Sequence, residues 1–355
     1  MGGKGKVFLI VWAVLMTFIA GGIVGLEFMR YFGKNTLDNK SPTTNPMLAQ
    51  NSVNAEMVTA TTSSKWEDDW VRYDGDVYDY NEDITTFLVM GIDKDDEFVK
   101  EVKEGADGGQ ADALFLLVIN PHDESVKIIG INRNSMTNVD VYDEYGMYQT
   151  TVWAQVCTQH GFGNGMEESC EYQVKAVSGM FYQLPIHGYA AINMSAIPII
   201  NDMVGGVDVT VLEDLTKADK KLVEGNRVHL DGDMALTYLR SRDASKFASS
   251  DRRLERQRQY LNAFIAAART ASEGGKNAAI DIFTGISDKM VTNISVEEIS
   301  YLAPLISKYS FDATDFKMIK GKTVKNGEFE EFNVDDDDLF KTIIEIFYEK
   351  VENVD

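Results

Sequence analysis

The sequence begins with an uncharged run that is long enough to cross a membrane. Twenty residues without a charge, Val7 to Leu26, follow Lys4 and Lys6. A helix of this length spans about 30 Å, the thickness of one hydrocarbon core. We therefore predict a cytoplasmic tail over residues 1–6 and a transmembrane anchor over residues 7–29, with the remainder exported because lysines precede the run. A cleaved signal peptide is the alternative; its apolar part is usually only about 7–15 residues long.

The exported part is strongly acidic. The 355 residues include 34 Lys and Arg against 56 Asp and Glu, a formal net charge of -22. Residues 1–34 carry four positive charges and one negative, a net of +3, which leaves -25 for the remainder. This balance excludes a general nucleic-acid partner, because duplex affinity depends on Lys and Arg that neutralise phosphates. A local site for a small anion stays compatible with it.

Positive charge is concentrated in one window of this acidic chain. Six of the eleven arginines lie between Arg240 and Arg258. Arginine suits buried recognition of phosphate, because it stays charged and offers a planar fork of donors. We predict that four arginines converge on one anion: Arg133, Arg240, Arg242 and Arg253. The alternative is that each of them pairs with one of the many carboxylates.

A helical projection separates the arginines of the last cluster. We take Leu254 as the centre of the apolar stripe of a helix, at about 100° per residue. Arg253 and Gln257 then lie one turn apart at the flank of the stripe and point inward. Arg252 and Arg256 fall on the far side, where we expect solvated positions.

Apolar runs that stop at turn residues predict a sheet. We expect strands over residues 87–90, 113–119, 126–131 and 188–194, with the second and third forming an antiparallel hairpin. Helical spacing predicts helices over residues 167–184, 231–240, 252–272, 296–307 and 339–351. Ser195 is expected to cap a further short helix that closes at Gly205 and Gly206. The predicted class is α/β, a mixed sheet flanked by helices.

This pattern also divides the chain. Residues 30–83 are polar or acidic and are predicted to be a linker and lead-in segment. Residues 84–272 hold the arginine cluster and both candidate carboxylates and form the main predicted domain. Residues 273–355 are predicted to be an extension that packs on this domain or continues it.

Two carboxylates lie at the ends of neighbouring predicted strands. Asp93 follows the first strand, in Gly91-Ile92-Asp93, and Asp112 precedes the next, in Gln110-Ala111-Asp112. Mg²⁺ typically takes one or two carboxylates and completes its shell with water and phosphate oxygens. The two carboxylates are therefore candidates for a shared Mg²⁺ site. The alternative is ordinary turn chemistry, in which Asp is common.

Cys157 and Cys170 are the only cysteines. In an exported protein they are candidates for a disulfide, which would close a short loop and contribute about 3 kcal/mol. The alternative is two buried thiols that behave as small apolar groups.

The order of the motifs is distinctive. Gly91-Ile92-Asp93 is followed by Gln110-Ala111-Asp112-Ala113 and Gly130-Ile131-Asn132-Arg133. Later come Gly-Gly-Val-Asp-Val over residues 205–209, Ala-Leu-Thr-Tyr-Leu-Arg-Ser-Arg over residues 235–242, and Asp-Arg-Arg-Leu-Glu-Arg-Gln over residues 251–257. Over residues 84–270 the chain resembles the LytR-CpsA-Psr family of bacterial cell-wall enzymes.

The resemblance implies a phosphotransferase at the outer face of the bacterial cell membrane, held by a single N-terminal span. Family members move a glycopolymer from a polyprenyl pyrophosphate carrier onto peptidoglycan. The family's motifs assign Mg²⁺ binding to Asp93 and Asp112. They assign pyrophosphate binding to five residues: Arg133, Arg240, Arg242, Arg253 and Gln257.

Two departures from the family's pattern bear on the chemistry. The family usually has Arg-x-Asp-Thr where this chain has Gln110 to Ala113, and Pro-Arg-Asp where it has Asn132-Arg133-Asn134. An amide such as that of Asn134 cannot accept the proton of an attacking hydroxyl. We therefore expect Asp112 or Asp251 to be the general base, with Arg133 as the third catalytic residue. The alternatives are a non-catalytic protein that binds the lipid carrier or the wall, and a pyrophosphatase that uses the same site.

Overall fold

The computed structural model describes residues 27–40, 45–48, 70–94, 108–143, 145–243, 245–272 and 278–352. The uncharged run Val7–Leu26 lies outside these ranges, as do the tail before it and most of the linker up to residue 69. Within the described ranges, no helix combines the length and the apolar character that a membrane crossing needs. The N-terminal anchor therefore stays a prediction from the sequence.

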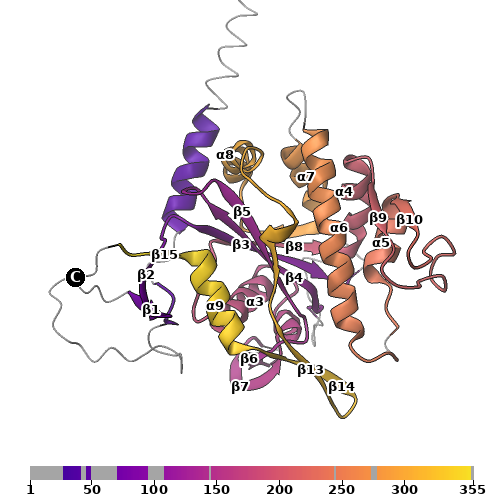
Figure 1. Cartoon of the computed structure of the whole chain (residues 1–355), viewed down its shortest axis with the longest axis horizontal. Coiled ribbons are helices and arrows are strands. Elements are labelled where there is room, and N and C mark those ends of the chain that lie inside the picture. Colours follow the sequence, from indigo (N-terminus) through magenta and orange to yellow (C-terminus); the bar gives the residue numbers. More distant parts are fainter. Residues whose placement is uncertain are drawn as a thin grey trace, which may run out of the picture.

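A six-stranded mixed sheet lies at the centre of the molecule (Figure 1), in the order β11-β8-β3-β4-β5-β12. The predicted hairpin is confirmed, because β4 and β5 pair antiparallel. β3 pairs antiparallel with β4 and parallel with β8, so the sheet is mixed as predicted. The strands are β3 (Thr85–Ile92), β4 (Ala111–Asn120), β5 (Ser125–Ile131), β8 (Gly188–Asn193), β11 (Met290–Thr292) and β12 (Phe316–Met318).

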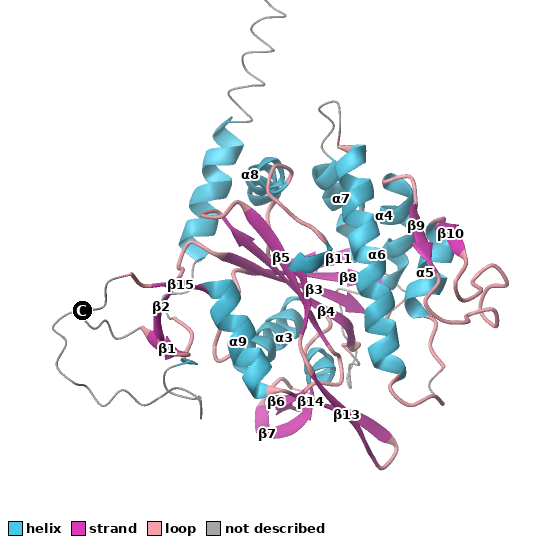
Figure 2. Ribbon diagram, in the orientation of Figure 1, coloured by secondary structure: helices cyan, strands magenta, loops and turns pink. Residues whose placement is uncertain are grey.

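Helices cover both faces of this sheet, as Figure 2 shows. Leu88 and Met90 of β3 belong to a core shared with α3 (Glu167–Met180) and α9 (Asp336–Phe347). Phe87 belongs to a second core, shared with the helix over residues 27–40 and with α8 (Val296–Ile306). Successive side chains of a strand point to opposite faces, so an apolar strand can supply two cores at once.

The helix over residues 27–40 is docked closely on α8. Leu37 is buried in the second core, and Lys40 Nζ lies 2.8 Å from Oε1 of the buried Glu298. At Gly33 an added Cβ would lie 2.1 Å from the backbone oxygen of Glu297, so only glycine allows this approach. These contacts hold the N-terminal helix against the domain.

A smaller unit packs beside the sheet. Its core includes Tyr238 and Tyr260 and is built from β9 (Val207–Thr210), β10 (Arg227–Leu230), α5 (Gly232–Arg240) and α6 (Ser249–Ala271). The predicted cap of α5 is confirmed, because Asp231 accepts a hydrogen bond from Met234 N at 2.9 Å. Gly205 and Gly206 both have the left-handed φ that closes α4 (Ile197–Met203). The predicted cap by Ser195 is wrong, because Ser195 lies inside η2 (Met194–Ala196) and α4 follows without a side-chain cap.

Segments from both ends of the chain complete the fold. β11 and β12, from the predicted C-terminal extension, are the two edge strands of the central sheet. β15 (Tyr348–Lys350) pairs with β2 (Asp76–Tyr80), which pairs with β1 (Val71–Tyr73). Residues 71–80 of the predicted lead-in are therefore folded structure. The helix expected over residues 339–351 ends at Phe347, because the chain then extends to pair with β2.

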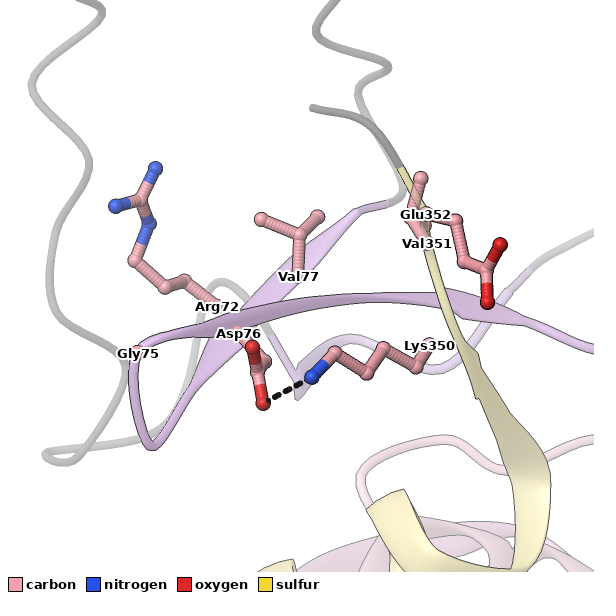
Figure 3. A pocket seen from close by; sticks show the side chains of 7 residues that line it. All are labelled: Arg72, Gly75, Asp76, Val77, Lys350, Val351 and Glu352. Carbon is pink, nitrogen blue, oxygen red and sulfur yellow. Dashed lines mark ion pairs between the residues drawn. The ribbon is translucent and has the colours of Figure 1, made fainter. Parts of the chain in front are cut away.

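The remaining elements are short. One hairpin is formed by β6 (Met136–Tyr142) and β7 (Tyr148–Gln155), and another by β13 (Gly321–Asn326) and β14 (Phe329–Val334). The remaining described helices are α7 (Ala278–Gly285), η1 (Val156–Phe162), η4 (Ser287–Lys289) and η5 (Ala313–Asp315). A pocket opens on the small sheet of β1, β2 and β15 (Figure 3), where Lys350 pairs with Asp76 at 2.7 Å. It is lined by none of the predicted site residues.

Candidate anion-binding site

Two arginines share one buried carboxylate at the end of the central sheet. Asp112, in β4, is 6% exposed. Its Oδ1 lies 2.6 Å from Arg133 Nη1, just after β5, and its Oδ2 lies 2.8 Å from Arg253 Nη1, in α6. Arg253 also donates to the backbone oxygen of Asp112 at 3.4 Å. One negative charge thus faces two guanidinium groups.

Arg133 has two further partners. Its Nη2 donates to Cys157 Sγ at 3.1 Å and to Gln110 Oε1. Burial opposes the charged form of Arg133, but Cys157 and Asp112 outweigh this effect and raise the pKa of Arg133. The guanidinium is therefore held in one orientation and stays fully charged. Gln110 is an acceptor here, at a position where the family usually has a cation.

The electrostatics of Arg253 show that positive groups gather around it. Burial lowers the pKa of Arg253, and although Asp112 opposes this, the neighbouring charges of Arg133 and Arg242 lower it further. Arg133 and Arg242 therefore both lie close enough to Arg253 to repel it. Such a cluster is costly unless an anion offsets it, and arginine binds phosphate oxygens with paired hydrogen bonds.

The two predicted metal ligands lie on adjacent strands. Asp93 follows β3, its backbone N donates to Gln110 O at 3.2 Å, and its Oδ1 lies 3.4 Å from Arg240 Nη2. Asp93 and Arg240 are both about half exposed, unlike Asp112. Within the described ranges no three His, Cys, Asp or Glu side chains are grouped around a potential metal position. A pair of carboxylates is what Mg²⁺ needs when phosphate oxygens and water complete its shell.

Arg242 is joined to the sheet through Ser250. Its Nη1 donates to Ser250 Oγ at 3.3 Å, and Asn134 Nδ2 donates to the same oxygen at 3.2 Å. Asn134 therefore supports the position of an arginine, although it cannot act as a base. All four arginines of the predicted cluster, Arg133, Arg240, Arg242 and Arg253, are connected by these contacts to one end of the sheet.

Asp251 is held by two neutral donors. Asn132 Nδ2 donates to its Oδ1 at 2.6 Å, and Thr323 Oγ1, from β13, donates to its Oδ2 at 2.8 Å. No arginine shares these bonds, in contrast to Asp112. Asp251 lies in the first turn of α6, two positions before Arg253.

The helical projection is confirmed at three positions and wrong at one. Arg253 and Gln257 are buried and Arg252 is exposed, as predicted. Arg256 is only 1% exposed, although a solvated position was expected. It pairs with Glu213 at 3.1 Å and lies over the ring of Tyr238, because α6 packs against the smaller unit on the side that faces away from Leu254. A projection with one apolar stripe cannot represent a helix that is covered on two sides.

The predicted disulfide is wrong, because both cysteines are free thiols. Cys157, in η1, faces Arg133, whereas Cys170, in α3, lies in the main core with its sulfur 3.9 Å from His160 Nε2. Burial raises the pKa of Cys157, and it raises that of Cys170 to about 12. The alternative of two buried thiols therefore holds.

The site also contains residues to which the sequence analysis gave no role in anion binding. Cys157 and Ser250 position arginines, and Thr323 positions Asp251. Glu330, from β14, accepts a hydrogen bond from Ala248 N just before α6. Ser250 directly precedes the Asp251 motif, which was a usable signal. Thr323 and Glu330 come from the C-terminal segment, and no motif near them in the sequence pointed to this site.

Comparison with known proteins identifies relatives of this chain. A family model described as the LytR_cpsA_psr family matches residues 46–345. The polyisoprenyl-teichoic acid–peptidoglycan teichoic acid transferase TagU of Bacillus mycoides is 29% identical over 213 residues, which are 60% of this chain and 61% of that protein. The corresponding transferase TagV of Bacillus subtilis is 27% identical over 259 residues, 71% of this chain and 60% of that protein. The matches thus span about three fifths of these relatives' lengths.

The fold of this chain also resembles that of a solved family member. The crystal structure of Bacillus subtilis TagV superposes with a TM-score of 0.57 at 25% identity, over 74% of this chain and 96% of that one. It has the same architecture of a sheet flanked by helices. The family model covers most of the chain, including the segments that supply Asp112, Arg133 and Arg253. The chain therefore belongs to the LytR-CpsA-Psr family.

Proposed function

We propose that this protein is a phosphotransferase that moves a glycopolymer from a polyprenyl pyrophosphate carrier to peptidoglycan. Membership of the family supports this proposal, as do the transferase names of the relatives TagU and TagV. The observation that carries it is the pairing of Arg133 and Arg253 with the single carboxylate of Asp112. A pyrophosphate brings several negative oxygens to a place where positive charge is in excess.

Arg133 and Arg253 would bind the pyrophosphate oxygens. The more exposed Arg240, at the end of α5, and Arg242, in the loop that follows, would bind them as well. Gln257 lies one turn after Arg253 on the same buried side and would donate a neutral hydrogen bond. Guanidinium groups aimed at the phosphates also stabilise the charge that develops on the leaving group. This contribution needs no rearrangement of the protein when the reaction occurs.

Asp93 and Asp112 are the residues that would hold Mg²⁺. Bound there, the ion would neutralise pyrophosphate charge as a Lewis acid. Both oxygens of Asp112 pair with Arg133 and Arg253, so a metal bound there would share them with the two guanidinium groups. The two carboxylates fit the oxygen ligands and the low carboxylate number that Mg²⁺ prefers.

In the proposed reaction, a sugar hydroxyl of peptidoglycan attacks the phosphorus that bears the glycopolymer. The new P–O bond forms as the P–O bond to the lipid phosphate breaks, and polyprenyl phosphate leaves. The hydroxyl proton passes to Asp251. We assign the base to Asp251 because its oxygens face only an amide and a hydroxyl, whereas both oxygens of Asp112 face guanidinium groups.

The anchor predicted over residues 7–29 would hold this site on the outer side of the membrane, beside the lipid that carries the donor. Tethering raises the effective concentration of the donor at the site. Because the helix over residues 27–40 is docked on the domain, the anchor would also fix the position of the domain relative to the membrane.

The test is turnover of a synthetic polyprenyl pyrophosphate-linked sugar by the full chain, with peptidoglycan and Mg²⁺. Release of polyprenyl phosphate together with sugar bound to peptidoglycan supports the transferase. Release without peptidoglycan identifies a pyrophosphatase, and binding without turnover identifies a carrier-binding protein. Asn134 favours this last alternative, because it replaces the family's usual carboxylate. Arg133→Ala is the site variant, and the exposed Arg252→Ala is its matched control.

A further inference from the structure

A long uncharged segment supplies the exposed strand of a hairpin beside the site. No Asp, Glu, Lys or Arg occurs from Tyr145 to Met166, in a chain of which 25% is charged. Within this segment β7 is exposed along most of its length, including Trp153 at 64% and Tyr148 at 56%. Large exposed aromatic side chains in an otherwise solvated strand mark an interaction surface.

The register of the hairpin places the two aromatic rings on one face. Trp153 pairs with Asn138, Thr151 with Asp140, and Tyr148 with Tyr142. Paired residues share a face, and the register shift beside Tyr142 keeps Tyr148 on the side of Thr151. The hydrogen bond of 2.9 Å between Tyr148 Oη and Thr151 Oγ1 agrees with this placement. We call this side, with Trp153, Thr151 and Tyr148 of β7 and Asn138 and Asp140 of β6, the hairpin face.

The hairpin face is continuous with the anion-binding site. Gln155 lies on the same face as Trp153, and its Nε2 donates to Glu330 O at 2.6 Å and to Asn134 Oδ1 at 3.4 Å. Asn134 contacts Ser250, which contacts Arg242. Residues two apart in a strand are separated by about 7 Å. The face therefore leads outward from the arginines.

Its chemistry matches an uncharged carbohydrate. The flat rings of Trp153 and Tyr148 can cover the apolar faces of sugar rings, and the hydroxyl and amide groups of Thr151, Asn138 and Gln155 can bond sugar hydroxyls. An anionic polymer does not suit this face. Asp140 lies on it opposite Thr151, the nearby Lys175 is already paired with Asp140 at 2.7 Å, and no basic residue lies on β7.

The position of the hairpin favours the wall over the membrane. In Figure 1 the β6–β7 hairpin and the helix over residues 27–40 lie at opposite ends of the molecule. That helix follows directly on the predicted anchor and is docked on α8, so the hairpin points away from the bilayer. We infer that the hairpin face binds a neutral glycan strand of peptidoglycan and guides the acceptor to the site. This inference rests on the proposed transferase function.

The test is binding of the full chain, in detergent, to chitohexaose and to peptidoglycan sacculi stripped of teichoic acid. We expect Trp153→Ala and Tyr148→Ala each to raise the apparent Kd about tenfold, because aromatic anchors dominate such surfaces. Trp153→Phe keeps a ring and is expected to retain most of the affinity, which separates loss of stacking from misfolding. The matched controls are Tyr145→Ala in the turn and Val152→Ser on the opposite face, and both should bind as the wild type does.

Wild-type Kd values for the Trp153→Ala and Tyr148→Ala variants, or no binding of either probe by the wild type, would overturn the inference. The inference would also be overturned if these variants kept glycan binding but lost binding to vesicles or self-association. The hairpin face would then bind lipid or a second copy of the chain. Arg133→Ala should keep glycan binding. If that binding depends on Trp153 while the wild type transfers no sugar, the proposed function fails alone. If transfer occurs and Trp153→Ala binds normally, this inference fails alone.

Discussion

Arg253 Nη1 lies 2.8 Å from Asp112 Oδ2, and both side chains are 5% exposed. This contact joins α6 to β4 across 141 positions of sequence. Arg133 holds the other oxygen of the same carboxylate. The site is thus organised around one acidic group that keeps two arginines in place.

Arg253→Ala is expected to lower kcat/KM for the pyrophosphate-linked donor about 100-fold, because a preorganised donor to the developing charge is lost. Arg253→Lys keeps the charge but lacks the planar fork, so it should recover only part of the rate. Steady-state assays measure both, with Arg252→Ala as the control. If Arg253→Ala has the same kcat/KM for the donor as the wild type, Arg253 does not bind the pyrophosphate.

Arg256 is expected to stabilise the fold and to leave donor binding unaffected. Arg256→Ala breaks the buried pair with Glu213 and the contact with Tyr238, and should lower the free energy of unfolding by roughly 3 kcal/mol. Guanidinium unfolding measures this change. Arg258→Ala, which loses only a surface pair with Glu255, is the control and should change stability by less than about 1 kcal/mol. Equal stability of the two variants would contradict the prediction.

Stability should fall on mild acidification because of His187. Burial lowers the pKa of His187 to about 4, and its Nδ1 accepts a hydrogen bond from Thr86 N at 3.1 Å. The unfolded chain takes up this proton near pH 6.5 and the folded chain only near pH 4, so stability is lost as pH falls between these values. The loss attributable to His187 is roughly 3 kcal/mol. Urea unfolding from pH 7 to 4 measures it.

His187→Gln removes the titrating group and keeps an acceptor for Thr86, so its pH dependence should be flatter in this range. The comparison uses the slope of unfolding free energy against pH and not the absolute stability, which the substitution also changes. Identical slopes for the wild type and His187→Gln would show that His187 is not the group responsible.

The cysteines should behave as two buried thiols. Without reductant, Cys157 and Cys170 should both remain unmodified by iodoacetamide in the folded protein at pH 8, because burial hides them and raises their pKa values. In denaturant both should be alkylated, which mass spectrometry detects as two adducts. No adduct in denaturant, with a mass lower by two hydrogens, would establish the disulfide instead.

Features that depend on neighbouring positions could be predicted from the sequence. The Asp231 cap, the closing glycines Gly205 and Gly206, the β4–β5 hairpin and the inward direction of Arg253 all follow from residues a few positions apart. The order of the short motifs also indicated the family, because each motif is a local arrangement of glycine, carboxylate and arginine around one sheet end.

The tertiary structure decided the rest, because it depends on contacts between distant segments. Arg256 is buried because α6 is covered on two sides, with Glu213 and Tyr238 on the side away from Leu254, and no single-stripe pattern encodes this. Cys157 faces Arg133 and Cys170 faces His160, because η1 and α3 turn them in different directions. Thr323 reaches Asp251 across 72 positions, and residues beyond 289 form both edges of the central sheet. Local periodicity specifies which side of an element is apolar, and only packing specifies what each side meets.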